Sequence, residues 1–172
     1  VRAAEGGTGA AKCGGNYAAS LLPTQNAIKK GYDQVMWTDA KTHSFIEEIG
    51  TMNVMFQVGN KIITPSLTSS ILGGITRKSV IALAKHWGVE IEETKVSLAD
   101  LVDAYNKCEL KDAFGTGTAA TITNISTIGV EGKDLLIPDG ASRDFSTKVG
   151  EYLSKLKAGE EEDFMNWIVK IK

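Results

Sequence analysis

Four stretches of the chain place apolar residues every three or four positions, the spacing that gathers them on one face of an α-helix. They predict helices over residues 16–30, 77–87, 97–108 and 145–156. Gly31 and Gly88 follow the first two, as expected for glycines that end helices, and Ser97 is expected to cap the start of the third. Pro23 predicts a bend within the first helix.

Between these stretches the pattern changes to short runs with a period of two, which is typical of strands. The runs cover residues 34–37, 44–49, 51–57, 61–64, 89–96, 121–128 and 135–138. Short turn segments separate the first four runs, which favours an antiparallel meander. The pattern therefore predicts a mixed α/β domain with a largely antiparallel sheet and flanking helices.

Composition narrows the class of protein. The chain has 172 residues with 42% apolar content, enough for one hydrophobic core and short for two, so we expect a single domain. A net charge of −2, with basic and acidic residues intermixed, argues against a nucleic-acid-binding or membrane-binding surface. Without a long apolar run or a signal pattern at the start, we expect a soluble, cytoplasmic protein. Cys13 and Cys108 lack the spacing of metal ligands, so no metal site is predicted.

The glycine-rich segment 5–17 places a single lysine, Lys12, between glycine pairs and before the first helix. Glycines allow a positive φ and let a flat ligand approach closely, while a desolvated lysine can attack a carbonyl group. The alternative is a flexible turn with Lys12 in solvent. Phosphate motifs do not fit, because Ala11 and Cys13 flank the lysine where a P-loop requires Gly and Ser or Thr, and no strand precedes it as a dinucleotide fingerprint requires.

Two acidic residues lie in the run 45–49. The period of two places Glu47 and Glu48 on opposite faces of a strand, each with apolar neighbours. A carboxylate on an apolar face needs a cation or a hydrogen-bond donor, and a protonated ring nitrogen of a ligand would serve. The alternative is that both residues are surface acids on an edge strand.

Two further segments suit anions. The glycine pair before the helix at Arg77 exposes backbone N–H groups at the positive end of the helix dipole, although a simple N-cap by Thr76 is a commoner reason for this pattern. In the segment 115–119 two glycines alternate with two threonines, which offers a closely approachable backbone and hydroxyl donors.

Taken together, four of these segments carry a specific resemblance. They read Lys12-Cys-Gly-Gly-Asn-Tyr17, Glu48-Ile-Gly-Thr-Met-Asn53, Leu72-Gly-Gly-Ile-Thr-Arg77 and Gly115-Thr-Gly-Thr-Ala119. In that order and spacing they resemble the pyridoxal-phosphate motifs of branched-chain amino-acid aminotransferases, in the class IV, fold type IV group. The resemblance runs over essentially the whole chain. It implies a barrel-like, largely antiparallel sheet with flanking helices and pyridoxal 5'-phosphate along one rim.

The resemblance implies a role for residues of the first three motifs. Lys12 would be the Schiff-base lysine and would then act as general acid and base at the substrate Cα. Tyr17 would contact the phenolic oxygen of the cofactor, and Glu48 rather than Glu47 would keep its pyridine nitrogen protonated. Leu72 would pack on the ring, and Thr51 is a further cofactor-binding residue.

The remaining implied contacts concern anions. Backbone N–H groups of Ile75 and Thr76 would bind the cofactor's phosphate, with Gly74 beside them, and the hydroxyl of Thr118 would reach the same phosphate. Backbone N–H groups of Thr118 and Ala119 would hold the substrate carboxylate.

The resemblance covers the C-terminal, larger domain of such an enzyme. Residues 1–172 are therefore expected to be this domain, without the N-terminal small domain that in the family supplies a phosphate-binding arginine and part of the substrate pocket. The implied function is transamination of leucine, isoleucine and valine with 2-oxoglutarate, so the partners are branched-chain amino acids and 2-oxo acids. The family also implies a homodimer. The 172-residue piece is expected to be nearly inactive by itself.

The sequence departs from the family pattern at two places, and two alternative functions remain open. Gly73 stands where some relatives have proline, and Ala120 and Thr123 stand where some carry a redox CxxC, so thiol regulation by that route is not expected. Another class IV activity, D-amino acid transamination or aminodeoxychorismate lyase, is one alternative. The other is a non-catalytic module that binds a phosphate ligand or nucleotide, in which Lys12 only pairs with an anion.

Overall fold

The computed structural model describes residues 1–169 and 171, and the side chains of these except residues 141 and 142. Its helices are α1 (Gly14–Ala18), α2 (Leu21–Ile28), α3 (Ile75–His86), α4 (Leu98–Asn106) and α5 (Asp144–Ala158), with a 3-10 turn at Gly140–Arg143. Its strands are β1 (Met36–Thr38), β2 (Phe45–Ile49), β3 (Asn53–Val58), β4 (Lys61–Pro65), β5 (Ile91–Thr94), β6 (Val96–Ser97), β7 (Leu110–Gly117), β8 (Thr121–Asn124), β9 (Thr127–Val130) and β10 (Lys133–Leu136). Within the described part, no helix is long and apolar enough to cross a membrane.

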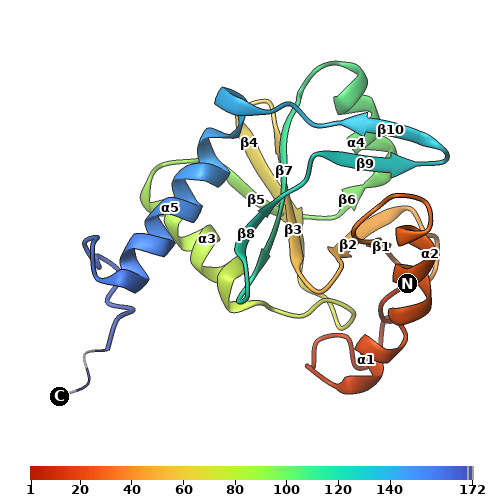
Figure 1. Ribbon diagram of the computed structural model, residues 1–172, viewed down its shortest axis with the longest axis horizontal. Coiled ribbons are helices and arrows are strands. Elements are labelled where there is room, and N and C mark those ends of the chain that lie inside the picture. The colour runs from red at the N-terminus through yellow and green to blue at the C-terminus, as the bar shows by residue number, and fades with distance from the viewer. Residues whose placement is uncertain (170, 172) are drawn as a thin grey trace.

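The strands form three sheets, and the predicted mixed α/β class is confirmed. A five-stranded sheet has the order β5-β4-β3-β7-β8, a three-stranded sheet the order β1-β2-β6, and β9 pairs with β10. The pairs are antiparallel except for β4 and β5, which run parallel and are connected through α3. In Figure 1, α3 and α5 lie on one side of the five-stranded sheet, and α4 with the β9–β10 hairpin lies on the other.

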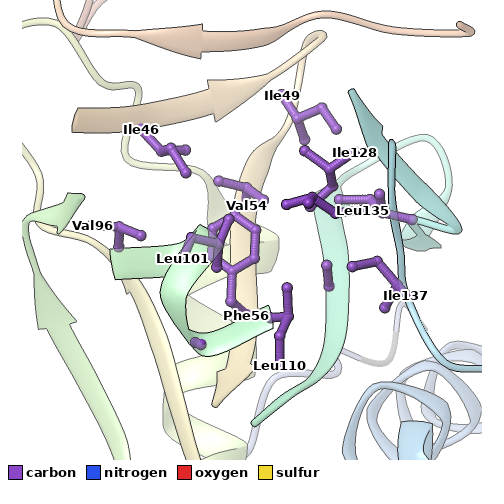
Figure 2. Close-up of a cluster of buried hydrophobic side chains, with 13 residues drawn as sticks. Ile46, Ile49, Val54, Phe56, Val96, Leu101, Leu110, Ile128, Leu135 and Ile137 are labelled. Atoms are coloured by element: carbon purple, nitrogen blue, oxygen red, sulfur yellow. The ribbon is translucent and has the colours of Figure 1, made fainter. Parts of the chain in front are cut away.

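The five-stranded sheet separates two apolar clusters, because neighbouring residues of a strand point to opposite faces. Val54 and Phe56 of β3 join a cluster to which all three sheets contribute, and Figure 2 shows their side chains converging on it. Met55, between them, joins the second cluster, which packs under α3 and α5. The first cluster is shared by all three sheets, which is the sense in which the arrangement is barrel-like, as the resemblance implied.

The predicted helix over residues 16–30 is wrong in one respect, because the structure has two short helices. The chain breaks between α1 and α2, and Pro23 lies in the first turn of α2, where a missing N–H breaks no helical hydrogen bond. The apolar stripe of this segment is not buried within the chain, since Leu21 and Leu22 are 65% and 66% exposed. The apolar spacing correctly predicted helical structure in this segment, but it did not predict that the apolar side chains would be exposed.

Two predicted strands also turn out to be pairs of strands. The run 89–96 is divided between β5 and β6, which belong to different sheets, and the run 121–128 is divided between β8 and β9. In each case the chain leaves one sheet and enters another within two residues. The apolar and polar residues continue to alternate across this point, while the strand that pairs with the chain changes. The predicted Ser97 cap of α4 is confirmed, since its side chain accepts a hydrogen bond from the N–H of Asp100.

Candidate active site

A cavity of about 240 Å³ lies where the loop before α1, the β2–β3 turn, the segment 72–76 and the end of β7 meet. It is lined by nine of the ten predicted site residues, which are Lys12, Tyr17, Glu48, Thr51, Leu72, Gly74, Ile75, Thr76 and Thr118. The tenth, Ala119, is exposed in the turn between β7 and β8 and does not line this cavity. The fold therefore brings together residues that are more than one hundred positions apart in the sequence.

Lys12 is an exposed side chain on a loop that hydrogen bonds hold against the segment before α3. The N–H of Gly6 donates to the hydroxyl of Ser69 at 2.7 Å, and the N–H of Ala10 donates to the Ser69 carbonyl at 2.9 Å. These contacts place the lysine loop next to the chain that leads into the 72–76 segment.

Gly9 allows this close approach. A Cβ at this position would lie 2.4 Å from backbone atoms of Ser70, a distance that real side chains do not tolerate. The glycines around Lys12 were predicted to provide positive φ and access for a ligand. Gly6 does have a positive φ of 79°, but Gly9 serves contact with another part of the chain, and the space beside Gly14 and Gly15 is open.

Asn16 fixes the chain just before Lys12. It is the one buried residue of α1, and its side-chain amide donates to the carbonyls of Thr8 at 2.9 Å and Ala11 at 3.0 Å. The Thr8 hydroxyl in turn donates to the Asn16 side-chain oxygen at 3.0 Å. Sequence reasoning included Asn16 in a motif but did not identify this role, since nothing in the local pattern marks a polar residue as buried.

Glu48 is buried, with 3% of its surface exposed, as its strand position allowed. Its Oε1 accepts a hydrogen bond from the N–H of Leu72 at 2.7 Å, and its Oε2 lies 2.6 Å from Nε of Arg2, close but poorly aligned for a hydrogen bond. Burial raises the pKa of this carboxyl group to about 7, although the charge of Arg2 and the Leu72 N–H act in the opposite direction and Glu47 adds a small increase.

Glu47 is not the surface acid that the alternative interpretation of this strand predicted. It is half-buried and accepts a short hydrogen bond from the hydroxyl of Ser70, while its Oε2 is buried without a hydrogen-bond partner among the described residues. Glu47 therefore holds the segment before α3, and Glu48 is the carboxylate that reaches the cavity.

Arg2 was missed by sequence reasoning. Its guanidinium is buried beside Glu48 and donates to the carbonyls of Gly9 at 2.8 Å and Ser70 at 2.5 Å. One side chain thus connects the lysine loop, the segment before α3 and the buried carboxylate. No local signal could have found it, because its partners lie 7, 46 and 68 positions away.

The N-terminus of α3 forms another wall of the cavity. The helix begins at Ile75, two residues earlier than predicted, and its N-cap is Gly74, which has an extended conformation and no side chain to cap the helix. The alternative of an N-cap by Thr76 is therefore wrong. Ile75 and Thr76 lie in the first turn, where backbone N–H groups have no partner within the helix and point toward the positive end of its dipole.

Threonine hydroxyls complete this end of the cavity. Thr116, near the end of β7, is 2% exposed and lines the cavity, and its hydroxyl has no hydrogen-bond partner among the described residues. Thr118 is exposed in the turn that follows. Thr51 lies in the β2–β3 turn, where Gly50 has a positive φ of 53° and its carbonyl accepts a hydrogen bond from the buried Trp37 ring at 2.8 Å.

Positive charge is scarce around this cavity. Lys12 is the one cationic side chain among the described residues that line it. Arg77, in the first turn of α3, is buried and directed elsewhere, since it donates to the Pro65 carbonyl at 2.9 Å and to Glu93 at 2.8 Å. An anion at the start of α3 would therefore meet backbone N–H groups and hydroxyls of this chain but no arginine.

Comparison with known proteins gives matches over most of the chain. Residues 6–128 match the family model described as Amino-transferase class IV. A Staphylococcus aureus (strain N315) protein described as a probable branched-chain-amino-acid aminotransferase is 46% identical over 171 residues, which are 99% of this chain and 48% of that protein.

Solved structures agree with these sequence matches. The branched-chain amino acid aminotransferase from Escherichia coli is 33% identical with a TM-score of 0.77, covering 94% of this chain and 50% of that one. The holo-form of the branched-chain amino acid aminotransferase from Thermobaculum terrenum, in its PLP-form, is 28% identical with a TM-score of 0.74, covering 94% of this chain and 49% of that one. Another such aminotransferase, from T.th., is complexed with N-(5'-phosphopyridoxyl)-L-glutamate and is 27% identical with a TM-score of 0.78, covering 95% of this chain and 51% of that one.

The chain thus spans about half the length of the curated relatives it matches. The segment that matches the family model contains all ten predicted site residues, and nine of them line one cavity. From its sequence and its fold, this chain belongs to the amino-transferase class IV family.

Proposed function

We propose that this chain carries the cofactor-binding part of a branched-chain amino-acid aminotransferase, with pyridoxal 5'-phosphate as its cofactor. One observation carries the proposal. A buried carboxylate, a free helix N-terminus and a lysine line a single cavity of about 240 Å³, and they are the residues of the family's motifs. The similarity to branched-chain aminotransferases, one of them in complex with a phosphopyridoxyl compound, supports the same conclusion.

The residues present suit this cofactor chemically. Burial raises the pKa of Glu48 to about 7 even with Arg2 beside it, so a protonated ring nitrogen would be a further cationic partner that favours the ionised carboxylate. The first turn of α3 offers N–H groups for a phosphate. The buried hydroxyl of Thr116, which has no hydrogen-bond partner in the described part of the chain, is a further polar group that a bound ligand or water would satisfy.

When bound, the cofactor supplies an electron-withdrawing ring that accepts the negative charge left at the substrate Cα. Lys12 would hold the cofactor covalently through its amine, and the same amine would act as general acid and base at the substrate Cα. Glu48 keeps the ring nitrogen protonated, while Tyr17 donates to the phenolic oxygen. Leu72, which lines the cavity, would pack against the ring.

The anion-binding groups orient the two ligands. The N–H groups of Ile75 and Thr76, beside Gly74, and the hydroxyl of Thr118 bind the phosphate. The N–H groups of Thr118 and Ala119 bind the substrate carboxylate. Thr51 is a further cofactor contact from the β2–β3 turn. Arg77 is bound to Glu93, and no arginine is among the described residues that line the cavity, which supports the proposal that another domain supplies one for the phosphate.

The substrates proposed are leucine, isoleucine and valine, with 2-oxoglutarate as the amino acceptor. The phosphopyridoxyl-glutamate complex of the T.th. enzyme supports the second substrate. Residues 1–172 would be the larger domain of a cytoplasmic homodimer, and without a small domain they would transaminate poorly. D-Amino acid transamination and aminodeoxychorismate lyase activity are the competing class IV reactions, and turnover with leucine, D-alanine and aminodeoxychorismate compares the three.

Borohydride trapping tests the proposal on the 172-residue chain itself. The chain is mixed with pyridoxal 5'-phosphate, reduced, digested and analysed by mass spectrometry. We expect a pyridoxyl group on Lys12, because only a Schiff base is converted to a stable secondary amine. Lys29→Ala, which removes an exposed lysine just after α2, is the control. This variant should be labelled at Lys12 to the same extent as the parent chain. Labelling spread over several lysines, or unchanged in Lys12→Ala, would favour the non-catalytic phosphate-binding module.

A further inference from the structure

Asn53, the first residue of β3, is a buried polar side chain that connects two walls of the cavity. It is 6% exposed and lines the cavity. Its amide nitrogen donates to the carbonyl of Leu72 at 2.8 Å, and its side-chain oxygen accepts from the N–H of Gly74 at 3.2 Å. The same nitrogen lies 3.5 Å from Oε1 of Glu48, at the limit of a hydrogen bond.

These contacts hold the segment before α3 from both sides. The N–H of Leu72 donates to Glu48 and the carbonyl of Leu72 accepts from Asn53, so both backbone polar groups of Leu72 are bound by cavity residues. The N–H of Gly74, the residue that caps α3, is shared between the Asn53 side-chain oxygen at 3.2 Å and the carbonyl of Leu72 at 2.9 Å. A carboxamide is the side chain that suits this position, because it carries one donor and one acceptor in a fixed plane.

Gly74 is shaped to receive this side chain. Its φ of −62° and ψ of 141° are accessible to any residue, so the backbone conformation does not require glycine here. A Cβ at Gly74, however, would lie 2.3 Å from the side-chain oxygen of Asn53. Glycine at the N-cap of α3 thus leaves room for Asn53, whose hydrogen-bonded side chain would have to shift to admit a Cβ.

We infer that Asn53 is a positioning residue that holds the N-terminus of α3 at a fixed place relative to Glu48. This inference rests on the proposed function, in which the α3 N-terminus binds a phosphate and Glu48 binds the ring nitrogen of the same molecule. A rigid cofactor touches both groups at once only if their separation is correct. Asn53 sets that separation because it bonds to the segment on each side of Gly73 and lies against Glu48.

Ligand selectivity tests this inference. Absorbance titration of the 172-residue chain compares pyridoxal 5'-phosphate with pyridoxal, which lacks the phosphate. Asn53→Ala should weaken binding of the phosphorylated ligand by about tenfold and that of pyridoxal by less, so the preference for the phosphate falls. Asn124→Ala, at an exposed position at the end of β8, is the matched control and should leave both affinities unchanged. Equal weakening of both ligands by Asn53→Ala would overturn the positioning role.

Asn53→Asp separates hydrogen bonding from shape, and it replaces Asn53→Ala should that variant not fold. Aspartate has nearly the same shape but cannot donate to Leu72, and it brings a second carboxylate close to Glu48. It should therefore bind pyridoxal 5'-phosphate no better than Asn53→Ala. Recovery of the parent affinity by Asn53→Asp would show that filling the space suffices and would contradict the inference.

A double-mutant cycle tests the geometry without any cofactor. Gly74→Ala should lower the thermal midpoint of the parent chain, whereas in the Asn53→Ala background the same substitution should have little further effect, because the atom that its Cβ would meet is gone. Additive effects would overturn the inference. A parent chain that shows this coupling but binds no pyridoxal 5'-phosphate would instead refute the proposed function and leave the positioning of α3 intact.

Discussion

The two sides of the cavity are built in opposite ways. The side that carries Glu48 and the α3 N-terminus lies beside the apolar clusters, where the first four residues of β3 are buried on both faces. The side that carries Lys12 belongs to the first 28 residues. Among the described residues of this segment only Arg2, Gly9 and Asn16 are buried, so no apolar side chain is buried there. Figure 1 shows this segment at the edge of the molecule.

The two sides differ in the interactions that hold their functional groups in place. The carboxylate and the anion-binding turn are positioned by the core and so share the stability of the whole domain. The lysine loop is held by hydrogen bonds to Ser69 and Ser70 and by the amide of Asn16. A loop with few buried apolar contacts opens more readily than the core. This division suits chemistry in which the cofactor stays anchored while the lysine attaches and leaves.

The largest effect is expected at the lysine. In the full-length aminotransferase proposed for this chain, Lys12→Ala should lower turnover roughly a thousandfold or more, because the proposed covalent attachment and proton transfer would both be lost. Cofactor binding should persist, since Glu48 and the α3 turn remain in place. Turnover of leucine and the absorbance of bound cofactor measure the two effects separately. Transamination at the parent rate by this variant would disprove the assignment of Lys12.

The next largest effect is expected at the anchored carboxylate. Glu48→Gln should lower turnover by roughly a hundredfold with a smaller loss of cofactor occupancy, because a neutral amide does not keep the ring nitrogen protonated. Glu47→Gln is the matched comparison on the neighbouring residue, whose contact is Ser70 rather than the cavity. Steady-state kinetics and cofactor content distinguish the two variants. A silent Glu48→Gln beside a damaging Glu47→Gln would show that the wrong carboxylate was chosen.

Burial of Glu48 should also be visible in the stability of the chain without cofactor. Its pKa is about 7 in the folded state against 4.5 for an unperturbed glutamate, so the folded state binds this proton more tightly. The resulting stabilisation is complete below about pH 4.5 and is lost as the pH rises through 7, a difference of at most about 3 kcal/mol.

Chemical denaturation at pH 5, 6, 7 and 8 measures this dependence. The parent chain should lose stability over this range relative to Glu48→Gln, which cannot titrate. Glu160→Gln, at an exposed position after α5, should behave as the parent does. A parent and a Glu48→Gln variant with parallel pH profiles would contradict the raised pKa.

The smallest effect is expected from the lysine loop. Gly9→Ala should cost about 1–3 kcal/mol, because its Cβ would overlap the backbone of Ser70 and force the two segments apart. Gly14→Ala, where the space is open, should stay within about 0.5 kcal/mol of the parent. Amide exchange should accelerate at Ala10 in the first variant while the strands of the core remain protected. Protection at Ala10 equal to that of the parent would show that the loop does not depend on this contact.

Sequence reasoning went far where its signals were local. Periodicity predicted α3, α4, α5 and most strands, and the four motifs named the residues that meet in one cavity. It failed where the chain changes partners. A strand that leaves one sheet for another keeps its alternation, so β5 and β6 looked like one strand, and the exposed stripe on α2 looked like a buried one.

By itself, the sequence determined the class of fold and the family, and it named the side chains proposed for the chemistry, because each depends on residue type and short spacing. The tertiary structure decided how those side chains are held. Arg2 reaches Ser70 across 68 positions, Asn53 reaches Leu72 across 19, and the backbone of Ser70 requires Gly9 to lack a side chain. Such contacts leave no periodic trace, since they arise only when distant segments are packed within a few ångströms of each other.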